Sequence, residues 1–143
     1  MRRMSWVVLA LVAVAGSAKA QVEFRPAPGP ALGPFTEAVR VGNLLFLSGT
    51  IGADSTGTLV KGGIAAEAKQ TMENIKTALT RNGLTMDRVV KCTVFLADIA
   101  EWPAFNQVYA TYFPGNKPAR SALGGVQLVR NARTEVECIA AMR

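Results

Sequence analysis

The stretch IAAEAKQTMENIKTALTRNGLTMDRVVKCTVFL, residues 64–96, decides the fold because it contains one clear helix followed by one clear strand. In its first half, five apolar residues recur at intervals of three and four, which places them on one face of a helix: Ile64, Ala68, Met72, Ile75 and Leu79. An Asn-Gly pair at 82–83 favours a helix stop in the left-handed conformation. The β-branched run RVVKCTVFL at 88–96 then predicts a strand.

Upstream of this stretch, the sequence predicts two strands joined by a tight turn. Residues 35–41 and 44–48 are strand-like, and Gly42-Asn43 lies between them. The turn residues at 54–57 are expected to lead into a short strand at 58–60. Four prolines fall within residues 21–34, so this segment is expected to be extended and to form neither a helix nor a central strand.

Downstream, the sequence predicts a second helix at 101–113, with Pro103 in its first turn and an aromatic stripe of Trp102, Phe105, Tyr109 and Tyr112. Two final strands are expected at 119–129 and 134–142. The order of elements predicts an α+β domain with a five- to six-stranded sheet and two helices on one face. Because two helices cannot cover both faces of such a sheet, the free face is expected to meet another subunit in a homo-oligomer.

Residues 1–20 have the layout of a secretory signal peptide. Arg2 and Arg3 precede the apolar run WVVLALVAVA, and Ala18-Lys19-Ala20 is an A-x-A cleavage site. The apolar run is shorter than the roughly 20 residues of a spanning helix, so an uncleaved membrane anchor is the less favoured alternative. We therefore expect residues 21–143 to form a single domain that is periplasmic or secreted and is not attached to a membrane after cleavage.

The expected mature chain is only mildly basic. The whole sequence has 16 basic and 10 acidic residues, and removal of Arg2, Arg3 and Lys19 reduces its net charge from +6 to +3. Without a run of Lys and Arg interleaved with aromatic residues, nucleic-acid binding has little support. The 143 residues include no histidine, which excludes a histidine-based triad or metal site. We expect neither a metal nor a cofactor.

The sequence leaves the state of its two cysteines open. Cys92 and Cys138 are too few and too far apart for a zinc motif. Each lies in a strand-like run, which favours two buried thiols, whereas an oxidising compartment would favour a disulfide. The sequence alone does not show whether their Cβ atoms meet.

Arg120 is the first candidate for binding a small molecule. It lies in the segment Pro118-Ala119-Arg120-Ser121, where a strand is expected to begin after a proline-containing loop. A guanidinium can hold a carboxylate through two parallel hydrogen bonds. Most arginines are nevertheless solvated or paired at the surface, and that alternative stays open from position alone.

Three further places in the sequence carry polar groups that could bind a small molecule or transfer protons. Glu135 and Glu137 share one face of the last strand, where two acids usually form a solvent face; the alternative is that one moves protons in a cleft. Ser48-Gly49 ends a strand, where a hydroxyl and exposed backbone N–H groups could meet a ligand; the alternative is an ordinary strand-to-turn transition. Asn106 follows the core residue Phe105 on the second helix and by itself indicates only a solvated position.

Together, these features resemble the RidA/YjgF family over residues 24–142. Each matching segment is short, but their order and spacing make the resemblance specific: Gly33-Pro34-Phe35, Gly42-Asn43, Leu47-Ser48-Gly49, Gln70-x-x-x-Asn74-Ile75, Val90-Lys91-x-Thr93-Val94-Phe95-Leu96, Phe105-Asn106-x-x-Tyr109, Pro118-Ala119-Arg120-Ser121 and Glu135-x-Glu137-x-Ile139-Ala140. The resemblance implies a chorismate-mutase-like fold with a mixed sheet, assembled as a homotrimer with a ligand cleft at each subunit interface. It also implies hydrolysis of small carboxylate-bearing imines and enamines, such as 2-iminobutanoate and 2-iminopropanoate, to 2-keto acids and ammonia.

The resemblance also implies roles for individual residues. Arg120 matches the residue that holds the substrate carboxylate, and Glu135 matches the acid that assists the attacking water. The expected substrate-binding residues of the cleft are Phe35, Ser48, Gly49, Asn106, Ser121 and Ala122.

Two of these residues depart from the family pattern. Phe35 stands where well-known members have tyrosine, and Ala122 stands where they often have cysteine. Both changes make the expected pocket more apolar. They motivate an alternative hypothesis, a non-catalytic trimer that binds small carboxylates or acts as a chaperone. RNA cleavage, which is attached to some relatives, has little support in the charge of this chain.

Overall fold

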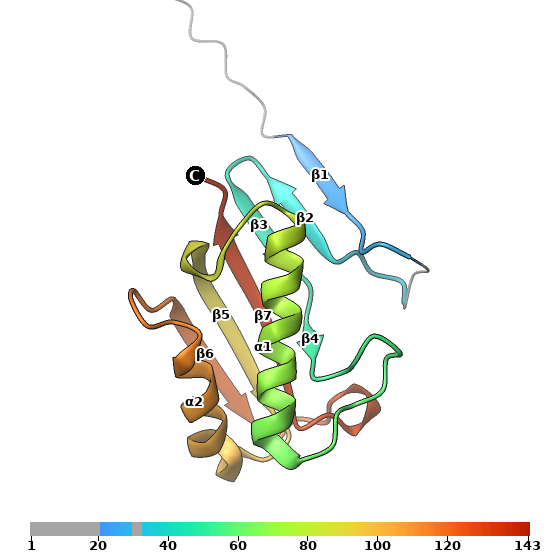
Figure 1. The fold of residues 1–143 in the computed structure, drawn as a ribbon, viewed down its shortest axis with the longest axis vertical. Helices are drawn as coiled ribbons and strands as arrows, with labels where there is room; N and C mark the ends of the chain where they lie inside the picture. Colours follow the sequence, from blue (N-terminus) through green and yellow to red (C-terminus); the bar gives the residue numbers. More distant parts are fainter. Residues whose placement is uncertain (1–20, 30–32) are drawn as a thin grey trace, which may run out of the picture.

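The computed structural model describes residues 21–29 and 33–143, so the expected signal peptide at 1–20 lies outside the described residues. Helices α1 (Gly63–Arg81) and α2 (Trp102–Thr111) pack side by side on one face of a sheet (Figure 1). The seven strands of this sheet are β1 (Val22–Arg25), β2 (Ala38–Val41), β3 (Leu44–Leu47), β4 (Thr50–Ile51), β5 (Val89–Leu96), β6 (Ala119–Gly124) and β7 (Thr134–Ala141). Three short 3₁₀ turns complete the described elements: η1 (Met86–Arg88), η2 (Ile99–Glu101) and η3 (Val129–Asn131).

The sheet is mixed, with the strand order β1-β2-β3-β7-β5-β6, and β4 pairs with β7 off this path. The pair β5–β6 is parallel, whereas the other strand pairs are antiparallel. The predicted α+β class, the mixed sheet and the two helices on one face are therefore confirmed. Among the described residues, no helix is long and apolar enough to cross a membrane.

Three local expectations need correction. The sheet has seven strands because the segment before the prolines pairs with β2 as an edge strand, β1, and because Thr50–Ile51 forms β4. No strand forms at 58–60, where a single bridge joins Ala53 to Leu59. The strand expected at 119–129 ends at Gly124, since Gly125 has a positive φ of 73° and the chain then forms η3.

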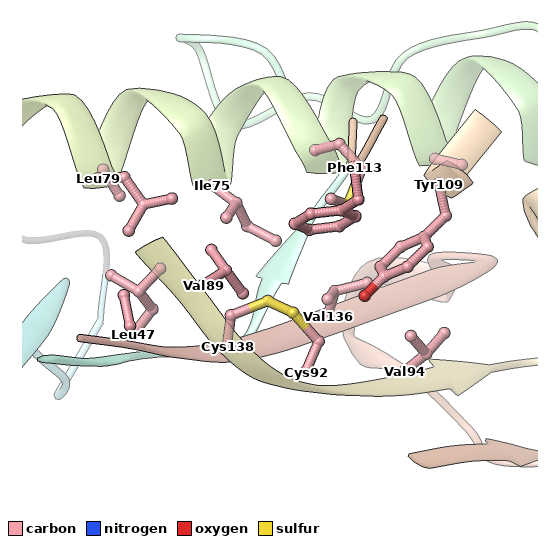
Figure 2. Packing of buried hydrophobic residues seen from close by; sticks show 14 of the residues in the cluster. Leu47, Ile75, Leu79, Val89, Cys92, Val94, Tyr109, Phe113, Val136 and Cys138 are labelled. Carbon is pink, nitrogen blue, oxygen red and sulfur yellow. A yellow bond between two sulfur atoms is a disulfide. The ribbon is translucent and has the colours of Figure 1, made fainter. Parts of the chain in front are cut away.

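The core lies between the helices and the sheet. The predicted apolar face of α1 is buried, with Ala68, Met72 and Leu79 fully covered. Gly83 has the predicted left-handed conformation, with φ of 73°, just after the helix. Figure 2 shows α1 residues Ile75 and Leu79 above side chains of the sheet. The fold thus depends on one face of α1 and alternate residues of β3, β5 and β7.

The opposite face of the sheet is not covered within the described chain. Side chains alternate across each strand, so Leu45 and Leu47 face the helices while Phe46 points away from them. Phe46 is 39% exposed, and Phe24, which shares this face through the β1–β2–β3 register, is 71% exposed. We call the face opposite the helices the open face; Leu44 and Leu123 are also exposed on it.

Cys92 and Cys138 form a disulfide in the core. They are direct partners in the β5–β7 ladder, with their Cα atoms 4.1 Å apart, and both are buried under the helices (Figure 2). The question that the sequence left open is therefore answered by the strand register, which brings the two side chains together on one face.

We expect this disulfide to stabilise the fold by about 2–4 kcal/mol, because it closes a chain segment of 46 residues. Urea unfolding of the oxidised protein should give a higher free energy of unfolding than that of protein refolded in reductant. The variant Cys92→Ala/Cys138→Ala is the control, and its unfolding should not respond to reductant. An equal free energy of unfolding for oxidised and reduced wild-type protein would contradict the prediction.

Candidate functional site

Arg120 lies on the edge strand β6 and faces the helix layer. In the parallel β5–β6 register it is the partner of Cys92, whose side chain is buried under the helices. Its guanidinium carbon lies 4.4 Å from the centroid of the Trp102 ring and 4.6 Å from that of Tyr109. Both distances are within the range of cation–π interactions. Among the described residues, no carboxylate forms an ion pair with Arg120.

The rings beside Arg120 belong to an aromatic row along α2. Successive ring centroids lie 6.1, 5.7 and 4.9 Å apart in the order Trp102, Phe105, Tyr109 and Phe113. Trp102, Phe105 and Tyr109 recur at helical spacing, so they share the face of α2 that packs on the sheet, and Phe113 continues the row just after the helix ends. Asn106 is half-buried and lies four residues after Trp102 and three before Tyr109, which places it on the side of the helix that carries both rings.

Tyr109 has two unusual properties. Its side chain is only 5% exposed, and its hydroxyl has no hydrogen-bond partner within the described chain. Burial raises the pKa of Tyr109 to about 12, while the positive charge of Arg120 acts in the opposite direction. Tyr109 is therefore neutral at physiological pH and presents its ring to the guanidinium.

Glu135 lies on the open face of the sheet. Its ladder partners are Phe95 on β5 and Ile51 on β4, and its neighbour Val136 points into the core. Burial raises the pKa of Glu135, and repulsion from Glu137 on the same face raises it further. A carboxyl group with a raised pKa can hold and release a proton closer to neutral pH than an ordinary glutamate can.

Gly49 makes room for the Glu135 carboxyl group. A Cβ atom at position 49 would overlap the Glu135 carboxylate oxygen and come within 3.0 Å of its carboxyl carbon. Glycine at this position therefore lets the Glu135 carboxyl group lie against the backbone of the turn after β3. Next to it, the Ser48 hydroxyl donates a hydrogen bond to the Thr36 carbonyl oxygen at 2.6 Å. Ser48 and Gly49 are thus brought to the Glu135 side of the sheet.

The start of β7 is fixed by a buried carboxylate from α1. Glu67 accepts a hydrogen bond from the Arg133 backbone N–H at 2.8 Å, and the Arg133 guanidinium pairs with Glu101 just before α2. Thr134, the first residue of β7, is fully buried and donates to the Phe95 carbonyl oxygen at 3.2 Å. The strand that carries Glu135 is therefore held at its first residues by contacts with α1, β5 and the segment before α2.

The structure divides most of the predicted site residues into two clusters on opposite faces of the sheet. The Arg120 cluster is the group on the helix side: Arg120 and Ala122 share that face of β6, and Asn106 lies on the side of α2 that carries the rings beside Arg120. The Glu135 cluster, on the open face, consists of Glu135, Gly49 and Ser48. Within one chain, the structure therefore does not bring Arg120 and Glu135 together.

The two remaining predicted residues lie outside these clusters. Ser121 alternates with Arg120 and faces the open side, where it accepts a hydrogen bond from Lys91 Nζ at 2.6 Å. Phe35 is 62% exposed in the loop before β2, where its ring lies against Gly33. Within the described chain, neither residue forms a hydrogen bond with the side chain of Arg120 or Glu135.

Trp102 and Tyr109 are site residues that sequence reasoning assigned only to the helix core. Their spacing of seven residues predicted a shared helix face, and this was confirmed. The spacing could not show that β6 would bring an arginine against that face. The parallel pairing of β6 with β5 determines this contact.

Comparison with known proteins agrees with this fold. The family model described as "Endoribonuclease L-PSP" matches residues 25–142. A mouse protein named 2-iminobutanoate/2-iminopropanoate deaminase is 43% identical over 111 residues, covering 77% of this chain and 82% of the mouse protein.

Two crystal structures from bacteria are similar in fold. RidA from Psychrobacter has a TM-score of 0.74 and 33% sequence identity, with 87% of this chain and 98% of the relative covered. Escherichia coli TdcF with bound serine has a TM-score of 0.74 and 31% identity, with 84% and 96% covered. The fold and the sequence define an α+β protein of the RidA/YjgF type. The chain belongs to the Endoribonuclease L-PSP family.

We expect the substitution Glu137→Gln to lower the pKa of Glu135, because it removes the like charge that shares its face. Carboxyl-carbon NMR titration measures this change directly and does not depend on catalysis. The control is Glu23→Gln on the edge strand β1, which is separated from β7 by β2 and β3. A Glu135 pKa that is the same in the Glu137→Gln variant and in wild type would contradict the contribution of the Glu137 charge to the raised pKa.

Proposed function

We propose that this protein is an imine and enamine deaminase that converts small carboxylate-bearing imines to 2-keto acids and ammonia. The observation that carries the proposal is the Arg120 guanidinium, which lies against two rings and has no carboxylate partner in the described chain. Its N–H donors are therefore free to bind a substrate carboxylate. The mouse relative is named as a deaminase of such imines, and TdcF was crystallised with serine, which also carries a carboxylate.

The reaction needs only water and proton transfers. The water oxygen bonds to the imine carbon, a proton moves to the nitrogen, and the C–N bond of the resulting carbinolamine breaks to release ammonia and leave a keto group. In this proposal Arg120 orients the substrate through its carboxylate. Glu135 takes a proton from the attacking water and returns it to the departing nitrogen, a role that its raised pKa supports.

We propose that the complete cleft forms between two subunits of a homotrimer. Arg120 and Glu135 face opposite sides of one sheet, so one substrate can meet both only if they come from different chains. The exposed apolar side chains of the open face, such as Phe46 and Phe24, support this assembly because burying them against another subunit is favourable. Phe35 and Ser121 are proposed to complete the cleft from these surfaces.

We also propose that the protein acts in the periplasm or after secretion. The layout of residues 1–20 supports export, and so does the Cys92–Cys138 disulfide, because structural disulfides persist mainly in oxidising compartments. The substrate would then be an imine present outside the cytoplasm.

The substitution Arg120→Leu is expected to lower kcat/KM for freshly generated 2-iminobutanoate by at least about 100-fold, since it removes the charged partner of the substrate carboxylate. Ammonia and 2-keto acid release measure the rate. The matched control is Arg81→Leu, which removes an arginine paired with Glu37 at the surface. Equal rates for wild type and Arg120→Leu would contradict the role of Arg120. Binding of 2-oxobutanoate without turnover of any imine would instead favour a non-catalytic carboxylate-binding protein.

Mixed trimers test whether the cleft takes its two charged residues from different chains. Co-expression of Arg120→Leu and Glu135→Gln chains is expected to restore activity in about a quarter of the clefts, where an intact arginine meets an intact glutamate. Each variant alone should stay inactive. Light scattering should give three times the subunit mass. Mixed assemblies as inactive as either parent would contradict a shared cleft.

A further inference from the structure

We infer that Trp102 and Tyr109 are positioning residues, whose rings hold the Arg120 guanidinium in place for a substrate carboxylate. The inference rests on the proposed role of Arg120 in carboxylate binding and extends it to two residues that do not themselves bind the carboxylate.

The first argument is the geometry of the contact. Trp102 and Tyr109 are seven residues apart on α2, which is about two helical turns, and the guanidinium carbon lies 4.4 and 4.6 Å from their ring centroids. One ring alone would leave the guanidinium free to move along its surface. Two rings separated along the helix axis restrict it to the space beside both.

The second argument is that little else holds Arg120. Strand β6 is the last strand of the sheet and has a neighbour, β5, on one side only within the described chain. The Arg120 side chain forms no hydrogen bond or ion pair with the described residues. Its guanidinium is therefore held there only by the two rings. An arginine side chain has many rotamers, and restricting them before a ligand arrives lowers the entropic cost of binding.

The third argument is that the rings are themselves fixed. Tyr109 packs against Phe105 and Phe113, with centroids 5.7 and 4.9 Å away, and Trp102 stacks on Phe105 at 6.1 Å. The Tyr109 hydroxyl has no partner in the described chain, so the ring is the part of Tyr109 that meets the guanidinium. When a ring lies against the flat face of a guanidinium, the N–H donors at the edge of the guanidinium stay available for a bidentate carboxylate.

The test compares removal of each ring with its conservative replacement in the full chain. Tyr109→Leu and Trp102→Leu are each expected to raise KM for 2-iminobutanoate and Kd for 2-oxobutanoate about tenfold, which corresponds to about 1.4 kcal/mol. We expect kcat to change less than threefold, because the groups that move protons are untouched. Tyr109→Phe and Trp102→Phe should restore most of the lost affinity, because a ring remains.

A second readout follows Arg120 itself. Ring currents should shift the NMR signal of the Arg120 Nε–H group away from that of a solvated arginine, and this shift should become smaller in each leucine variant, because one of the two rings is then missing. The control is Phe113→Leu, which removes a ring from the same core, just after α2, that does not form a cation–π contact with the guanidinium. It reports how much of any effect comes from a loosened core.

The outcomes separate this inference from the proposed function. A smaller Nε–H shift together with weaker 2-oxobutanoate binding supports the inference. An unchanged shift, an unchanged Kd in both leucine variants, or an equal rise in Kd in Phe113→Leu would overturn it. Failure of the phenylalanine variants to restore binding would also overturn it, since the hydroxyl or the indole N–H would then be responsible. If no imine is hydrolysed while the leucine variants still lose 2-oxobutanoate affinity, the proposed function fails and the positioning role stands.

Discussion

The alternation of side chains across β5, β6 and β7 is the constraint on which the rest of the structure depends. One row across these strands, Cys138, Cys92 and Arg120, faces the helices. Cys138 and Cys92 form a disulfide in the core, and Arg120 extends to the aromatic face of α2. The rows that face the other way carry Glu135 and Glu137 on the open face. A shift of one residue in any of these strands would turn that strand's own side chains to the opposite face and remove them from their partners.

This arrangement links the stability of the fold to its chemistry. The side of the sheet that buries the core also holds Arg120, the residue proposed to bind the substrate carboxylate, and two rings of α2 contact its guanidinium. The side that lacks a helical cover holds a carboxyl group whose pKa is raised by partial burial and by its neighbour. The two residues proposed to carry out the reaction therefore lie in different environments: Arg120 lies beside aromatic rings of the core, and Glu135 lies on the open face. Assembly of several chains is a physically reasonable way to bring such halves together, and it would also cover the apolar side chains of the open face.

Much of the fold could be predicted from the sequence because its signals are local. The interval pattern of α1 and the β-branched run of β5 reflect periodicities that hold within one element. The predicted faces of α1 and β7 were confirmed for this reason. The strand predictions were wrong where hydrogen bonding to another segment decides whether a strand forms. Strand β1 forms because β2 offers it an edge, and the segment at 58–60 forms no strand because only Leu59 finds a partner, in a single bridge to Ala53.

For the candidate site, the sequence by itself determined which chemical groups are available and in what context. It supplied an arginine after a proline-containing loop, two glutamates on one strand face, and no histidine. Only the tertiary structure decided that Arg120 rests on Trp102 and Tyr109, that Gly49 leaves space for Glu135, and that the two cysteines meet. The tertiary structure also separated Arg120 from Glu135 by placing them on opposite faces. The physical reason is that composition and periodicity are properties of one segment, whereas these contacts depend on the register between strands that are far apart in the chain.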